Sequence, residues 1–285
     1  MSGPLTVQAI HIYPVKALHG LFLPQAAVEP WGLAQDRRWM VVQPDGRFLT
    51  QRDLPEMARV LAEVRPDGLT LRQDGAEAIR IARPGEGAIR RQVSVWRDEV
   101  PALDAGAAAA SWLSAALGTA CGLVYLDDPT ARPVDPAYGL PEDRAAFSDG
   151  FPLLLASEAS LDALNAELAQ PIPMSRFRPN VVISGALPWA EDRWRRIRIG
   201  TASFRVVKPC SRCVVTTVDQ ETGQRPDRTE PLKTLARLRK APGGVMFGQN
   251  LIPDGSGEIA IGDKVELVEL GRSNVELSAL QGQVE

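Results

Sequence analysis

The chain has 285 residues, 45% hydrophobic and 24% charged, which is typical of a globular protein with a large core, and its formal charge of −3 excludes nucleic acid as the principal ligand. The first residues lack a secretory signal, and no apolar run reaches the ~18 residues of a membrane span. Three cysteines are too few for a disulfide framework, so we expect a cytoplasmic protein with no membrane span.

The first 126 residues show the alternation and turn signals of short strands. Pro44-Asp-Gly46 and Pro66-Asp-Gly68 each separate two apolar runs, a pattern typical of hairpins. A helix is predicted over 104–117, with Asp104 as its N-cap and Gly118 at its end. Strands are expected over 5–13, 39–42, 47–49, 60–64, 69–71, 79–81, 93–96 and 121–126.

Residues 127–147 are rich in Pro, Asp and Arg and have no clear periodicity, which indicates a linker. Helices are predicted over 157–168, with Ser157 as the cap, and over 230–239. Further strands are expected over 152–156, 180–184, 196–199, 203–207, 214–218 and within 257–270. The predicted fold class is α+β, predominantly β, with two β-barrel-like domains at 1–126 and 148–285 and a few peripheral helices.

The densest group of chemically active side chains is Cys210-Ser-Arg-Cys213. Two cysteines at this spacing suit half of a zinc site, a redox-active pair or a structural pair of buried thiols. Zinc would need ligands beyond Cys121 and the two histidines that remain. A thioredoxin-like pair would open a helix, whereas the run after Cys213 has the pattern of a strand.

A fourth interpretation of the two cysteines is a thiolate ligand to a soft metal. Lys208 and Arg212 beside the thiols favour the thiolate form. One such ligand suffices if a cofactor provides most of the coordination. The spacing alone leaves all four interpretations open.

Several cations stand next to turns and strand ends. Each alone has the ordinary interpretation of a solvated surface residue, but together they could form an anion pocket, because a guanidinium fork matches phosphate bidentately. Asn180 could add its amide to the edge of a heterocycle. The cations are Lys16, Arg37, Arg38, Arg178 and Arg212.

Other enzyme classes find little support. Two histidines give little material for a Ser-His-Asp hydrolase, and neither a dinucleotide fingerprint nor a phosphate loop of standard spacing is present. A hydrolase built on two carboxylates stays open, because 35 acidic residues always supply pairs.

Short motifs follow one another from Ile10-His-Ile-Tyr-Pro-Val-Lys16 to Gly262-Asp-Lys-Val-Glu266. Between these lie Asp36-Arg-Arg-Trp39, Ser148-Asp-Gly-Phe-Pro-Leu153, Ser157-Glu-Ala-Ser160, Phe177-Arg-Pro-Asn-Val-Val-Ile-Ser-Gly185, Cys210-Ser-Arg-Cys-Val-Val-Thr-Thr-Val-Asp219 and Phe247-Gly-Gln-Asn250. In this order they resemble the MOSC-domain family, in the branch that includes the mitochondrial amidoxime-reducing component and its bacterial relatives.

The resemblance implies a β-barrel N-terminal domain followed by the MOSC domain, with molybdenum-molybdopterin bound between them. The family's molybdenum ligand is the second cysteine of its motif, which falls on Cys213 and leaves Cys210 as a neighbour. Ala17 stands where many relatives have serine, and Gly150 and Phe151 stand where hydroxyl residues contact the cofactor. The implied cofactor contacts are Lys16, Arg37, Gly150, Phe151, Arg178, Asn180, Ser211, Arg212 and Cys213.

The resemblance also implies a molybdenum-dependent reductase of N-hydroxylated compounds or N-oxides, in which Cys213 is catalytic and Asp149 is a candidate for proton delivery. The chain has too few cysteines for an iron–sulfur domain and no dinucleotide fingerprint, so a separate flavin, haem or iron–sulfur reductase is the expected partner. Pyridoxal phosphate binding, a family-level association, is not expected here. The alternative is a molybdenum-cofactor carrier or sulfur-transfer module without turnover.

Overall fold

The computed structural model describes residues 3–281, and the chain is predominantly β with few helices, which confirms the predicted fold class. The strands of these residues form four sheets. The barrel-like expectation needs a correction, because the sheets are not closed into barrels. Within the described residues, the first and last strands of the largest sheet do not pair with each other.

The largest sheet has nine strands and draws mainly on the second half of the chain. Its order is β20 (Val265–Leu270), β15 (Trp194–Ile199), β16 (Ala202–Arg212), β18 (Gly244–Pro253), β13 (Leu153–Ser157), β14 (Val181–Ser184), β1 (Thr6–Ile12) and β3 (Leu21–Leu23), with β17 (Lys240–Ala241) paired to β18. The first strand of the chain therefore belongs to this sheet, where it runs antiparallel to β14.

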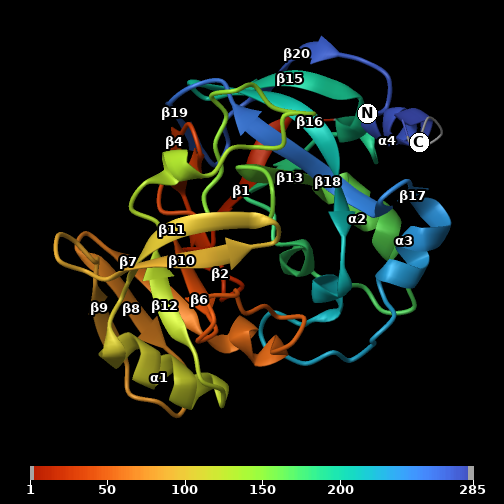
Figure 1. Cartoon of the computed structure of the whole chain (residues 1–285). Coiled ribbons are helices and arrows are strands. Elements are labelled where there is room, and N and C mark those ends of the chain that lie inside the picture. The colour runs from red at the N-terminus through yellow and green to blue at the C-terminus, as the bar shows by residue number, and fades with distance from the viewer. Residues whose placement is uncertain (1–2, 282–285) are drawn as a thin grey trace.

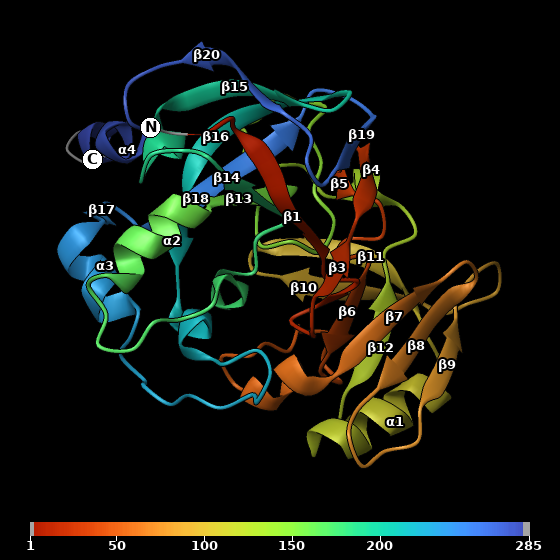
Figure 2. The same ribbon diagram turned by 180° about the vertical axis from the view of Figure 1, so that it is seen from behind.

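The other three sheets contain most of the strands from the first half. A five-stranded sheet has the order β10 (Arg90–Val95), β11 (Asp98–Asp104), β12 (Gly122–Tyr125), β6 (Trp39–Val42) and β2 (Val15–Lys16). The three-stranded sheets are β7 (Leu61–Arg65), β8 (Gly68–Arg72), β9 (Ile79–Ala82), and β19 (Gly257–Ala260), β4 (Gln25–Glu29), β5 (Gly32–Leu33). Figures 1 and 2 show β6 to β12 gathered in one half of the molecule and β13 to β18 in the other.

Within residues 3–281, four α-helices lie at the periphery (Figure 1): α1 (Ala107–Leu117), α2 (Glu158–Asn165), α3 (Leu232–Leu238) and α4 (Asn274–Gln281). Short 3-10 helices are η1 (Pro55–Arg59), η2 (Pro129–Ala131), η3 (Met174–Phe177), η4 (Ala190–Arg193) and η5 (Val214–Thr217). Gly118 ends α1 in the left-handed conformation, as predicted.

The predicted N-cap of α1 is wrong. Gly106 occupies that position, and Asp104 is the last residue of β11. The Asp104 carboxylate instead accepts a hydrogen bond from the Gly106 N–H at 2.7 Å, a local turn that the sequence pattern does not distinguish from a cap.

The strand predicted over 214–218 is also wrong, because the chain forms η5 there. The Thr216 and Thr217 hydroxyls donate to the carbonyl oxygens of Cys213 and Val214, at 2.9 and 2.8 Å. Such local bonds compete with a strand ladder. The chain consequently leaves β16 at Arg212 and turns at Cys213.

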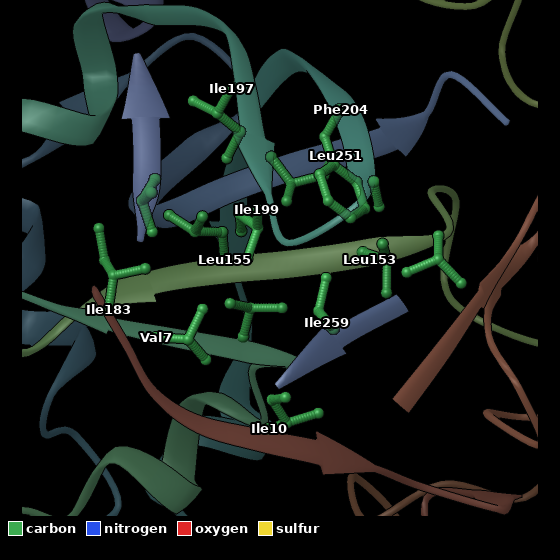
Figure 3. Packing of buried hydrophobic residues seen from close by; sticks show 14 of the residues in the cluster. Val7, Ile10, Leu153, Leu155, Ile183, Ile197, Ile199, Phe204, Leu251 and Ile259 are labelled. Carbon is green, nitrogen blue, oxygen red and sulfur yellow. The ribbon is translucent and has the colours of Figure 1, made fainter. Parts of the chain in front are cut away.

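Strands from both ends of the chain share the apolar core of the nine-stranded sheet (Figure 3). Ile10 of β1 packs in one cluster with Leu155 of β13, Ile197 of β15 and Leu251 of β18, all of them fully buried. Each such side chain contributes ~1.5–3 kcal/mol by leaving water. This core holds β16, and with it the cysteine motif, in a fixed position.

The predicted linker is tied to neighbouring elements through Arg132, which is 3% exposed. Its guanidinium donates to Asp98 Oδ2 at 2.7 Å, to the carbonyl oxygens of Ala146 and Asp149 at 2.8 and 3.0 Å, and to that of Ser148. These bonds fix the loop that enters β13. The domain boundaries at 126 and 148 stay a prediction.

Candidate functional site

One cavity of about 550 Å³ brings the candidate residues together, a volume within the usual range for small-molecule sites. Its wall includes segments before and after the predicted linker. The predicted residues that line it are Lys16, Arg37, Asp149, Gly150, Phe151, Arg178, Asn180, Ser211, Arg212 and Cys213. Arg38 lies elsewhere: it is 8% exposed and donates to the Leu126 carbonyl at 2.6 Å.

Cys213 stands at the turn between β16 and η5. Its carbonyl accepts from the Thr216 N–H at 3.1 Å as well as from the Thr216 hydroxyl, which fixes the backbone there. Its thiol is half-buried and faces the cavity. Cys210 precedes this turn within β16 and lines the same cavity.

The cations contact the thiols differently from the expectation that Lys208 and Arg212 act on both. Arg212 Nη1 donates to Cys210 Sγ at 2.9 Å, and Arg52 Nη2 donates to Cys213 Sγ at 3.2 Å. The Lys208 ammonium lies 4.3 Å from the centre of the Tyr138 ring. The cation at the predicted ligand is therefore Arg52, from a distant part of the sequence.

Arg37 and Arg178 meet at one buried aromatic ring, with each guanidinium carbon 4.2 Å from the centre of Tyr13. Burial raises the pKa of Tyr13 to about 12, although the two arginines oppose this, so the phenol is neutral. Burial lowers the pKa of Arg178 to about 10, and Arg37 adds to the effect, so the Arg178 guanidinium keeps its charge at neutral pH.

Asn180 is buried and connects three segments of the wall. Its Oδ1 accepts from Arg37 Nη1 at 3.0 Å and from the Leu154 N–H at 3.1 Å, and its Nδ2 donates to the His11 carbonyl at 3.1 Å. Asn180 therefore orients Arg37 and the start of β13.

Lys16 and Asp149 form an ion pair at the cavity wall, with Nζ 2.5 Å from Oδ1. Burial lowers the pKa of Lys16 to about 8, with Asp149 opposing the shift. Partial loss of hydration in the cavity would by itself raise the pKa of the Asp149 carboxyl, but Lys16, and after it Arg52 and the Trp96 indole, hold this pKa well below its ordinary value. Asp149 is thus an anion at neutral pH.

The remaining predicted residues line the cavity without reaching its charged groups through their side chains. Phe151 packs edge-on against Tyr138 at 6.0 Å, and Ser211 Oγ donates to the Gly243 carbonyl at 2.7 Å. A Cβ atom added at Gly150 would meet nothing within 4 Å, so the space beside the Gly150 backbone is open.

The sequence pattern missed Arg52, Trp96 and Gln51, which also line the cavity. Trp96 Nε1 donates to Asp149 Oδ1 at 3.3 Å, and Gln51 exchanges two hydrogen bonds with Gln220 at 3.1 and 2.8 Å. These contacts join segments far apart in the chain. The one local signal was a large aromatic side chain at a predicted strand end, Trp96.

A model of the MOSC N-terminal beta barrel domain matches residues 4–120, and a model of the MOSC domain matches residues 142–266. The chain belongs to the MOSC-domain family. Mitochondrial amidoxime-reducing component 1 of Mus musculus is 35% identical to it over 285 residues, which cover 92% of this chain and 82% of that protein. The family expected from the motifs is confirmed.

Two further similarities are more partial or more distant. Molybdenum cofactor sulfurase of Oryza sativa subsp. japonica is 31% identical over 263 residues, covering 85% of this MOSC chain but 32% of that protein. The crystal structure of the YuaD protein from Bacillus subtilis is 11% identical with a TM-score of 0.44, covering 93% of this chain and 96% of that one. Among residues 3–281, no helix has the length and apolar character needed to cross a bilayer.

Proposed function

We propose that this MOSC protein is a molybdenum-cofactor-dependent reductase of N-hydroxylated compounds or N-oxides, with Cys213 as the protein ligand to molybdenum. The observation that carries this proposal is that Cys213 and the cations Lys16, Arg37, Arg178 and Arg212 line one cavity. A phosphate-bearing cofactor with a thiophilic metal requires both kinds of donor.

The electrostatics of the wall fit such a cofactor. Six cations line the cavity with one carboxylate, Asp149, so their mutual repulsion favours an anionic ligand. The Nε of Arg212 is buried and finds no hydrogen-bond partner in the part of the chain that the structure describes. A phosphate accepting from these groups would gain ~1.5–3 kcal/mol for each charge-assisted bond.

When bound, the cofactor supplies a two-electron centre at which oxygen leaves the substrate as water. The chain's own residues would hold and orient it: Cys213 would bind the metal, Arg37 and Arg178 would bind the phosphate, and Asn180 keeps Arg37 in place. Asp149 is our candidate for proton delivery. Because Asp149 is an anion at neutral pH, it would pass protons on rather than store them.

In this proposal the electrons come from a separate flavin, haem or iron–sulfur reductase. The proposal also places this protein in the cytoplasm. The deciding experiment measures molybdenum and pterin in the purified protein and its reduction of benzamidoxime. We expect close to one of each per chain, turnover with reduced viologen and none with NADH alone. Stoichiometric zinc without pterin, or NADH-driven turnover without a partner, would contradict the proposal.

The similarity to molybdenum cofactor sulfurase supports a second candidate, a cofactor carrier or sulfur-transfer module. Such a protein would bind the same cofactor in the same cavity. It would release cofactor to a cofactor-free acceptor enzyme and would not reduce benzamidoxime. The two assays, run on one preparation, separate the candidates.

A further inference from the structure

Arg52 contacts Cys213, the predicted metal ligand, from a distant part of the sequence. Its Nη2 lies 3.2 Å from Cys213 Sγ, while 161 residues separate the two along the chain. Arg37, Arg178 and Arg212 donate to oxygen or to Cys210 instead. Among the described residues, Arg52 is thus the side chain that donates a hydrogen bond to the Cys213 sulfur.

An aromatic ring supports the Arg52 guanidinium. The guanidinium carbon lies 4.5 Å from the centre of the Trp96 ring, and Phe48 packs edge-on against the same indole at 5.1 Å. Flat contact with an indole is a favourable geometry for a guanidinium and limits its rotation.

Trp96 has a backbone conformation that smaller residues usually adopt. Val95 pairs with Asp98, which leaves Trp96 and Arg97 as a two-residue turn, and Trp96 has φ +59°. Gly, Asn and Asp are favoured at such positions. A bulky side chain held there, 49% exposed at the cavity, indicates that its placement serves the site.

The backbone of Arg52 is held from the loop that follows Cys213. Arg225 Nη2 donates to the carbonyl oxygens of Gln51 and Arg52, at 2.9 and 2.8 Å. The Gln51 side chain also donates to the Ala17 carbonyl at 2.8 Å and pairs with Gln220. Both the side chain and the main chain of Arg52 are therefore fixed before any ligand enters.

We propose that Arg52 is a positioning residue for the Cys213 sulfur, which it orients by an N–H donor and whose electron donation to the metal it weakens. The proposal rests on the proposed function, since it concerns the ligand sulfur. Hydrogen bonds and positive charge at a ligand sulfur favour the reduced metal, so they raise the reduction potential. Other cations would hold the pterin phosphate in the proposed function, so Arg52 would not be required for retention of the cofactor.

The test compares holoprotein variants by the midpoint potential of the Mo(VI)/Mo(V) couple, measured by a redox titration that follows the Mo(V) EPR signal. We expect Arg52→Gln to lower the potential, because it removes the charge and the forked donor, with molybdenum and pterin contents near those of the wild type. Arg52→Lys keeps the charge and should lower the potential by less. Arg198→Gln, which removes an exposed partner of Glu266 on β15, serves as the matched control.

Unchanged potentials in both Arg52 variants, with the metal retained, would overturn the proposal. Loss of molybdenum from both variants with normal pterin content would also overturn it, because Arg52 would then retain the metal. A wild-type protein without molybdenum contradicts the proposed function itself, and the metal analysis shows this before any variant is compared.

Discussion

Lys16 Nζ lies 2.5 Å from Asp149 Oδ1, although 133 residues separate them in the sequence. Lys16 is buried, whereas the Asp149 side chain, which also lines the cavity, keeps 69% of its surface exposed. The ammonium also donates to the Phe147 carbonyl at 2.7 Å. The charge of a buried cation in the cavity wall therefore depends on a carboxylate that a ligand can reach.

Asp149→Asn should shift the pH range in which the cofactor is retained. The carboxylate opposes the effect of burial on Lys16, so its loss lowers the pKa of Lys16 below about 8. In the proposed function the protonated Lys16 ammonium binds the phosphate, so pterin retention should fall as the pH rises through the pKa of Lys16. In the variant this fall should occur at a lower pH than in the wild type. Pterin left after dialysis over a pH series measures this. Coincident curves for the two proteins would refute the coupling, with Asp45→Asn at an exposed pair as the control.

Cys213→Ser should remove most of the molybdenum and reduce activity by more than about tenfold, because a neutral hydroxyl replaces the thiolate. Cys210→Ser should have a smaller effect, since Cys210 accepts from Arg212 within β16. Metal analysis and benzamidoxime turnover measure both. Equal losses in the two variants would show that Cys213 is not the sole ligand.

The double variant Arg178→Ala, Arg212→Ala should lose pterin. Two charge-assisted bonds to phosphate correspond to about 3 kcal/mol or more, which exceeds a hundredfold in affinity. Pterin content per folded chain is the measurement, with circular dichroism to check the fold. Arg65→Ala, Arg198→Ala removes two exposed arginines and should keep the pterin. Full pterin content in the cavity variant would rule out the anion pocket.

Glu191→Gln should change the pH dependence of stability. Glu191 is 1% exposed, accepts from Ser160 Oγ at 2.9 Å, and burial raises its pKa to about 7. The folded state therefore binds the proton more tightly than the unfolded state, whose pKa is near 4.5. The free energy of unfolding then falls as the pH rises from 4.5 to about 7, by at most ~3 kcal/mol.

The variant should lose this pH dependence and exceed the wild type in stability above about pH 7. Urea unfolding at about pH 5 and about pH 8 measures the difference, with Glu63→Gln at an exposed pair as the control. A wild-type stability that rises between these two pH values would contradict the assignment to Glu191.

Four of the five cations that the sequence grouped together line one cavity, but Arg38 lies elsewhere and Arg52 was missed. Lys16, Arg37, Arg178 and Arg212 follow from motifs of the family, and they do line one cavity. Their individual partners depend on side-chain directions that a motif does not encode, which is why Arg212 meets Cys210 rather than Cys213.

Local patterns failed where short-range bonds or distant strands decide the structure. The run after Cys213 is β-branched and apolar, yet two threonine hydroxyls turn it into η5. The sequence pattern did not predict the strand β18, although β18 pairs with both β16 and β13 in the sheet. Arg52 lies in an ordinary polar loop, and its importance appears only once Trp96, Arg225 and Cys213 are near it.

The place of β1 in the nine-stranded sheet also sets an order of events during synthesis. Thr6 pairs with Ser184, which the ribosome adds 178 residues later, and β14 connects β1 to β13. Pairing at such separation is slow, because a long loop must close first. The earliest strand to emerge therefore waits, with an unpaired edge, until most of the chain exists. The cavity, which needs both Lys16 and Cys213, is complete only after that, so any ligand of this cavity can enter only a nearly finished protein.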